Sequence, residues 1–221
     1  METDRPWIIV RVDGKVSAIS NDYSLFAQIA SGMAKTPANR NKAQYAEINE
    51  VLCTKTGFEE VWQLSRTLKW EDMRLFGTPF QKKVWKKLFE LTHGPDILPD
   101  ADTKASAACA QQGRPKPRLI SYSDFAELCE NRPGVRAVAH AIGLNPVSVV
   151  IPCHLVIPKE SADKINEIKK MAEVTLFKGD DLCFPSDIDF GNYALGPAMK
   201  RELIALELTG RQTSHCPLTS H

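Results

Sequence analysis

Residues 145–158 place an adjacent cysteine and histidine shortly after a stretch, 147–151, in which four of the five residues are β-branched. The run at 147–151 is stiff and apolar, which predicts a buried β-strand, and Pro152 is expected to end that strand. An imidazole beside a thiol is a common means of activating a cysteine as a nucleophile. A buried cysteine is more often only a small apolar side chain, so Cys153 and His154 alone leave both interpretations open.

Composition limits the class of protein. The chain has 221 residues, of which 43% are apolar and 25% charged, as in globular proteins with one large or two small domains. Its apolar runs are far shorter than the roughly 20 residues of a membrane-spanning helix, so no membrane partner is expected. Six cysteines stand without C-x-x-C spacing, which argues against both a disulfide framework and a zinc site. No bound metal is expected.

The net charge of +1 is unevenly distributed. Residues 1–77 carry 10 basic and 10 acidic groups, residues 78–156 carry 10 and 7, and residues 157–221 carry 8 and 10. A basic central segment is typical of phosphate binding, although the lysines at 82–87 taken alone favour a solvated helix face. The basic residues of interest are Lys82, Lys83, Lys86, Lys87, Arg114, Lys116 and Arg118.

The N-terminal part predicts a small α/β domain at residues 1–75. Residues 8–12 and 16–19 flank Asp13-Gly14, which is typical of a β-hairpin with a tight turn. Mixed helical patterns, interrupted by a polar stretch at 36–44, continue to about Trp70.

A helix is predicted after Thr78, which caps it while Gln81 completes a capping box and Pro79 takes the first helical position. Gly94 is expected to end this helix. The side chains expected to be buried along it are Phe80, Val84, Leu88 and Leu91.

Two further helices are predicted next, in a helix-turn-helix pattern. Ser121 caps the first of them, with Asp124 in its first turn, and it runs to about Asn131. Residues 132–134 form a turn, and 135–142 form the second helix.

The second domain is predicted at residues 76–212. It contains insertions near 95–118 and 159–190, and the middle of the second, 162–176, has a helical pattern. A flexible tail is expected at 213–221.

The motif Pro152-Cys153-His154-Leu155-Val156 resembles the active-site signature of the O6-alkylguanine-DNA alkyltransferases, Pro-Cys-His-Arg-Val, with leucine in place of arginine. Further blocks resemble the same family in the same order, from Thr78 to Gly210. They are Thr78-Pro79-Phe80-Gln81, Ile120-Ser121-Tyr122, Arg136-Ala137-Val138, Asn145-Pro146, Gly191-Asn192-Tyr193 and the residues from Glu202 to Glu207.

The resemblance implies an α+β fold, with a small RNase H-like N-terminal lobe followed by a mostly helical winged-helix domain that carries the active site. It implies direct-reversal DNA repair, in which the alkyl group of O6-alkylguanine, or of O4-alkylthymine, passes irreversibly to Cys153. No cofactor is implied. The implied partner is double-stranded DNA, bound through its minor groove with the damaged base flipped out. A monomer in the nucleus is expected.

The resemblance also assigns four residues to the chemistry. Cys153 accepts the alkyl group, His154 acts as its base through a bound water, and Glu207 orients the imidazole. Asn145 bridges backbone groups at the turn before the thiol. Taken alone, Glu207 is equally a solvated carboxylate and Asn145 a plain turn former.

Four residues are assigned by the resemblance to the DNA and the base. Arg136 fills the space that the flipped nucleotide leaves, and Tyr122 crowds its phosphate and donates to the base. Tyr193 walls the alkyl pocket, and Val156 belongs to the base-binding motif. The alternative for Tyr122 is core packing.

The chain departs from the family pattern at three positions near the site, Leu155, Ala194 and Leu195. Leu155 removes a cation, Ala194 lacks a hydroxyl that donates to O6, and Leu195 narrows the pocket. Ala139 and His140 also replace small residues on the recognition helix. These changes keep a second hypothesis open, a relative that binds alkylated DNA and recruits other repair factors. A cysteine hydrolase using the same thiol is a third.

Overall fold

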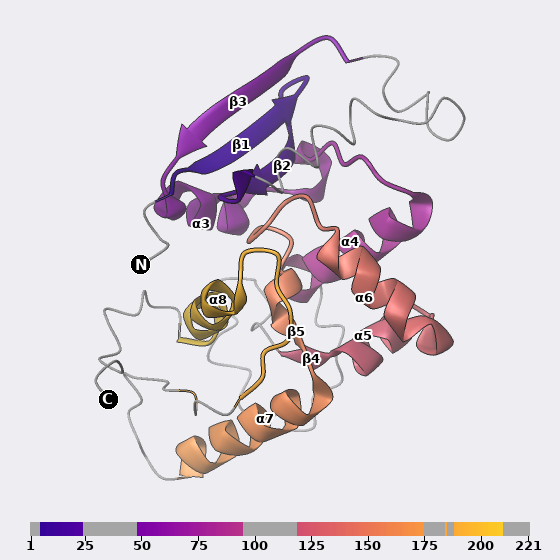
Figure 1. Cartoon of the computed structure of the whole chain (residues 1–221), viewed down its shortest axis with the longest axis vertical. Helices are drawn as coiled ribbons and strands as arrows, with labels where there is room; N and C mark the ends of the chain where they lie inside the picture. Colours follow the sequence, from indigo (N-terminus) through magenta and orange to yellow (C-terminus); the bar gives the residue numbers. More distant parts are fainter. Residues whose placement is uncertain (1–4, 24–47, 95–118, 175–183, 185–187, 210–221) are drawn as a thin grey trace. The chain divides into compact units, whose positions relative to one another are not determined.

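The computed structural model describes residues 5–23, 48–94, 119–174, 184 and 188–209 (Figure 1). Predictions for the polar stretch 36–44, the first insertion at 95–118 and the tail at 213–221 fall outside these residues. The chain divides into two compact units, one formed by residues 1–90 with 139–153 and the other by residues 91–138 with 154–221. The described elements have an α+β composition, as predicted.

The first unit contains a three-stranded antiparallel sheet in the order β2-β1-β3, drawn in indigo and purple in Figure 1. Strands β1 (Trp7–Val12) and β2 (Lys15–Ser20) form the predicted hairpin. Both turn residues have positive φ, 49° at Asp13 and 77° at Gly14, as the tight hairpin turn requires.

Strand β3 (Val51–Thr56) was not predicted, because the segment was interpreted as part of a mixed helical pattern. It pairs with the full length of β1, yet its first five residues are exposed, whereas β1 is buried at five of its six positions. An exposed strand lacks the alternation of apolar and polar residues by which a strand is identified in sequence. Its position is set by hydrogen bonding to β1.

Helix α3 (Phe58–Thr67) follows β3, and the short 3-10 helix η2 (Trp70–Asp72) follows α3. Phe58 tilts against Trp7 of β1, with ring centroids 5.9 Å apart, and Val61 is fully buried. Helix α3 therefore packs against strand β1 through the rings of Phe58 and Trp7.

Helix α4 (Pro79–His93) begins and ends close to the predicted limits. The backbone N–H of Gln81 donates to the Thr78 hydroxyl at 3.2 Å, and that of Thr78 donates to the Gln81 side chain at 2.8 Å, which confirms the capping box. The expected burial of Phe80 is wrong, because its residue is 36% exposed in the first turn of the helix. Burial of the other predicted positions is confirmed at Val84, Leu88 and Leu91.

The second unit contains a short parallel pair, β4 (Ile120–Ser121) with β5 (Val156–Ile157). Helix α5 (Tyr122–Leu128) begins after β4, and its cap is the predicted one, since the backbone N–H of Asp124 donates to the Ser121 hydroxyl at 3.1 Å. The helix ends three residues before the predicted Asn131. Glu130 has a φ of 56°, and this left-handed residue stops the helix.

The remaining elements follow the predicted order. Residues predicted as a turn form the 3-10 helix η5 (Arg132–Gly134), and α6 (Val135–Gly143) follows it. The second insertion begins with α7 (Lys159–Val174), and α8 (Pro197–Thr209) is the last described helix. The helical pattern predicted at 162–176 is therefore confirmed as far as Val174.

The strand predicted at 147–151 is wrong, because this segment is a tight turn. The backbone N–H of Ile151 donates to Val147 O at 3.0 Å, and Val149 has a φ of 72°. Only Val147 pairs as a strand residue would, in an isolated parallel bridge to Ile19 of β2. β-Branched residues favour strands locally, but here the hydrogen bonds of a neighbouring side chain fix a different backbone path.

Candidate active site

The candidate nucleophile lies at the end of this turn. Cys153 begins the 3-10 helix η6 (Cys153–Leu155), its residue is 7% exposed, and it makes no disulfide. Its backbone N–H donates to Ile151 O at 2.8 Å. The turn is joined to the sheet of the first unit because the N–H of Ile19 donates to Pro146 O and that of Ser148 donates to Ile19 O. The thiol is therefore presented by a constrained loop.

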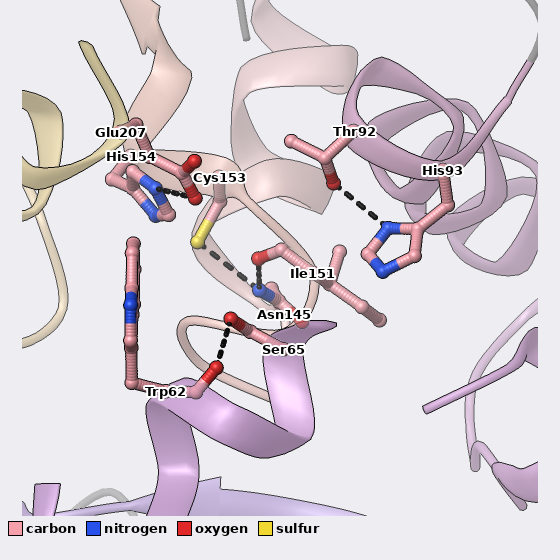
Figure 2. A network of polar contacts seen from close by, with 9 residues as sticks. All are labelled: Trp62, Ser65, Thr92, His93, Asn145, Ile151, Cys153, His154 and Glu207. Atoms are coloured by element: carbon pink, nitrogen blue, oxygen red, sulfur yellow. Dashed lines mark hydrogen bonds and ion pairs between the residues drawn. The ribbon is translucent and has the colours of Figure 1, made fainter. Parts of the chain in front are cut away.

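Asn145 connects the two ends of this loop (Figure 2). Its Oδ1 accepts from the backbone N–H of Val147 at 3.0 Å, and its Nδ2 donates to Ile151 O at 2.8 Å. The same Nδ2 lies 3.1 Å from Sγ of Cys153. An N–H directed at the sulfur stabilises negative charge on it, so this buried amide both shapes the loop and favours the thiolate. The predicted bridging role of Asn145 corresponds to these contacts.

His154 and Glu207 form the second part of the candidate site, within the second unit (Figure 2). Nε2 of His154 lies 3.6 Å from Oε1 of Glu207 on α8, and both side chains are almost fully buried. Neither ring nitrogen of His154 makes a hydrogen bond to a described residue. A buried carboxylate beside an imidazole orients the ring.

Tyr193 and Tyr122 belong to the same unit as His154. The ring of Tyr193 stands edge-on to that of His154, with centroids 6.4 Å apart. Tyr122 begins α5, and a Cβ added to Gly191 would lie 3.6 Å from its hydroxyl and 3.3 Å from Pro158. Gly191 also has a φ of 72°, so the loop before Tyr193 requires glycine for both its conformation and its close approach.

The backbone carbonyl of Val156 accepts a hydrogen bond from Nζ of Lys200 at 2.8 Å. Lys200 is fully buried, and its Nζ lies 5.8 Å from the centroid of the Tyr122 ring. Sequence reasoning missed this lysine. Lys200 lies seven residues before Glu207 on α8, and a lysine in a helix is usually interpreted as a solvated residue, so only the three-dimensional structure reveals its burial.

The other predicted positions lie in different environments. Arg136 is exposed near the start of α6, where its side chain is available to a partner. Leu155 is fully buried, so the residue that replaces the motif arginine is part of the core. Ala194 is exposed and Leu195 is half-buried in the loop after Tyr193.

No group of three or more His, Cys, Asp or Glu residues suited to a metal ion occurs in the part of the chain that the structure describes. Within the same residues, no helix is both long and apolar enough to cross a bilayer.

The chain resembles known proteins over part of its length, including the segment that holds Asn145, Cys153 and His154. Residues 111–172 match the family model described as 6-O-methylguanine DNA methyltransferase, DNA binding domain. A "Probable methylated-DNA--protein-cysteine methyltransferase" of Acanthamoeba polyphaga mimivirus is 37% identical over 90 residues, which cover 41% of this chain and 45% of the relative. An inducible methylated-DNA--protein-cysteine methyltransferase of Bacillus subtilis is 37% identical over 86 residues, covering 39% and 35%.

Among solved structures, the O6-methylguanine-DNA methyltransferase of Pyrococcus kodakaraensis aligns with 92% of this chain and 93% of its own, at 19% identity and a TM-score of 0.48. The chain spans less than half the length of each of these two curated relatives. The range matched by the family model, residues 111–172, includes Cys153. The chain is therefore similar to methylated-DNA--protein-cysteine methyltransferases over part of its length.

Proposed function

We propose that this protein repairs DNA by direct reversal, moving the alkyl group of O6-alkylguanine to Cys153. The single observation that carries the proposal is the 3.1 Å contact between Nδ2 of Asn145 and Sγ of Cys153. A buried amide that donates to sulfur prepares a thiolate, and a thiolate is the soft nucleophile that attack on an alkyl carbon needs. The names of the relatives support the same reaction.

The chemical step is a displacement at carbon. Sγ of Cys153 forms a bond to the alkyl carbon, the bond from that carbon to O6 breaks, and its electron pair remains on the guanine. His154 receives the thiol proton through a water, and Glu207, 3.6 Å away, stabilises the imidazolium. The departing guanine takes up a proton, for which the hydroxyl of Tyr122 is the proposed donor. Because this site cannot cleave the resulting thioether, each molecule acts once.

The proposed substrate is double-stranded DNA with its damaged base turned out of the stack. Arg136, exposed on α6, enters the minor groove and occupies the space that the base leaves. Tyr193 walls the alkyl group, and Val156 contacts the base. O4-Alkylthymine is a further proposed substrate of the same site.

Several architectural predictions stay proposals. We place domain limits near residues 75 and 76, with an RNase H-like first lobe and a winged-helix second domain in which α5 and α6 form a helix-turn-helix. A monomer is proposed, because one chain holds every residue assigned to the reaction. Nuclear residence follows from the substrate, and imaging of a fluorescent fusion checks it.

The experiment that tests the proposed function follows the alkyl group. The protein is incubated with a duplex oligonucleotide containing O6-methylguanine, and its peptides are then mapped by mass. We expect a methyl increment on the peptide that contains Cys153 and unmodified guanine in the DNA. Cys153→Ala should bind the duplex without changing it. An unmodified Cys153 peptide together with intact O6-methylguanine would contradict the proposed function.

A second candidate is a protein that binds alkylated DNA and recruits other repair factors without transfer. Ala194 favours it, since a methyl group replaces the hydroxyl that would donate to the leaving oxygen. Under this alternative the duplex is bound tightly, its alkyl group persists, and Cys153→Ala has the same affinity as the original protein.

A further inference from the structure

The second insertion lies between two parts of the candidate site. It begins at α7, directly after β5, and its described return segment ends immediately before the loop that carries Tyr193. Three residues of this return segment are buried, each at most 6% exposed: Phe184, Ile188 and Phe190. A segment packed this tightly constrains its neighbours, so its contacts bear on the site.

Ser161 ties the first turn of α7 to the return segment. Its side chain is buried, and its hydroxyl donates a hydrogen bond to the backbone carbonyl of Asp189, 28 residues later. The carboxylate of Asp189 in turn accepts from the backbone N–H of Gly191 at 2.7 Å. The first turn of α7 is thereby linked to the residue at which the Tyr193 loop begins.

Arg201 of α8 holds the return segment from another element. Its Nη2 donates to the backbone carbonyl of Phe184, and its guanidinium lies 6.0 Å from the Phe184 ring and 5.7 Å from the Phe190 ring. The two rings meet edge to face with centroids 5.3 Å apart. A planar cation against two aromatic rings makes a stable contact with defined geometry.

The loop from Gly191 to Gly196 is therefore constrained at both ends. Upstream, Gly191 is joined to Asp189. Downstream, the N–H of Gly196 donates to Tyr193 O at 3.0 Å, and that of Lys200 donates to Gly196 O at 3.2 Å, which leads into α8. Between these ends the ring of Tyr193 stands edge-on to His154.

We propose that the first turn of α7 together with Phe184 and residues 188–190, here called the strut, sets the size of alkyl group that the site accepts. Ser161 and Arg201 are its positioning residues, and they act through Tyr193. This inference rests on the proposed function, in which Tyr193 walls the alkyl pocket. Because the strut resists displacement of the loop, a methyl group fits, whereas a benzyl group must move Tyr193 and is transferred slowly.

The first test measures selectivity. Two duplexes of one sequence carry O6-methylguanine or O6-benzylguanine, and single-turnover rates are measured at saturating protein. Arg201→Gln should raise the benzyl-to-methyl rate ratio by roughly tenfold, since a relaxed wall admits the larger group. Ser161→Ala should raise it in the same direction. Arg201→Lys, which retains the charge and a donor for Phe184 O, should restore the original ratio.

Lys159→Gln is the matched control, because Lys159 lies on the same turn of α7 and pairs only with exposed Asp163 among its described contacts. It should leave the ratio unchanged. If Arg201→Gln lowers both rates by one common factor, or if Lys159→Gln changes the ratio equally, the specificity role of the strut is wrong.

The second test needs no activity. Hydrogen exchange should quicken in residues 188–193 of Arg201→Gln, while residues 203–207 of α8 keep their protection. Quickened exchange without any methyl transfer by the original protein would overturn the proposed function, and with it the specificity role of the strut, while showing that Arg201 still holds the Tyr193 loop in place. Unchanged exchange at 188–193, with methyl transfer intact, would overturn the strut alone.

Discussion

The side-chain amide of Asn145 donates to Sγ of Cys153 at 3.1 Å, across eight residues of chain. The same amide bonds to backbone groups at Val147 and Ile151, so one buried residue fixes the loop and contacts its nucleophile. Asn145 therefore affects both the stability of the loop and the reactivity of Cys153, and different substitutions of Asn145 distinguish these two effects.

Replacing Asn145 by alanine should lower the free energy of unfolding by about 1–3 kcal/mol, because the buried N–H of Val147 and carbonyl of Ile151 lose their partner. Asn145→Asp retains the acceptor for Val147 but places a negative charge beside the sulfur. We therefore expect it to slow alkylation of Cys153 more than its loss of stability explains. Urea unfolding and iodoacetamide labelling measure the two effects. Asn192→Ala, at an exposed residue, is the control, and equal labelling rates for all variants would contradict the assignment.

Glu207 should support the rate of transfer through His154. Glu207→Gln removes the charge that stabilises the imidazolium, and we expect the single-turnover rate to fall by about 10²-fold while affinity for the duplex is retained. Rapid-quench measurement of methyl transfer gives the rate, and a filter-binding titration gives the affinity.

The matched control is Glu202→Gln, because Glu202 lies on the same helix but is exposed. It should transfer at the original rate. The role assigned to Glu207 fails if both glutamine variants lose the same activity.

Local signals explain why much of the fold was predictable. The hairpin turn at Asp13-Gly14 and the caps at Thr78 and Ser121 depend on residues within three positions of one another. Because such interactions join residues that are close in sequence, the local sequence is sufficient to predict them.

The thiol loop shows where local signals fail. Its valines and isoleucine predict a strand, but the amide of Asn145 bonds at both ends of the loop, and Val149 takes a φ of 72°. The hydrogen bonds of Lys200 and Arg201 likewise join them to partners 44 and 17 residues away in sequence. No pattern within one helix reveals such partners.

Asp13 should make the stability of the first unit depend on pH. Burial alone would raise the pKa of Asp13, but hydrogen bonds from the backbone N–H groups of Asn49 and Glu50, and the charge of Arg74, outweigh it and hold that pKa below its ordinary value of 3.8. A carboxyl with a lowered folded-state pKa contributes stability that is present above the ordinary value and lost as pH falls through the lowered one.

The measurement is urea unfolding from about pH 6 to pH 2, on the original protein and on Asp13→Asn. At about pH 6 the original protein should have a higher free energy of unfolding than Asp13→Asn. The difference in free energy of unfolding between the two proteins should shrink as the pH falls below the ordinary carboxyl pKa of 3.8. Parallel curves throughout this range would show that Asp13 contributes nothing that depends on its charge.

Glu130 offers a stabilising substitution at the end of α5. It has a φ of 56°, its backbone N–H donates to Glu127 O at 2.8 Å, and that of Asn131 donates to Ala126 O at 2.9 Å, which together form a Schellman motif. Glycine adopts this left-handed conformation without the strain that a Cβ imposes, so Glu130→Gly should raise the free energy of unfolding by about 1 kcal/mol. Glu127→Gly, inside the helix, should lower it by about the same amount. Thermal unfolding compares the two variants, and a loss of stability in both would mean that Glu130 is not strained.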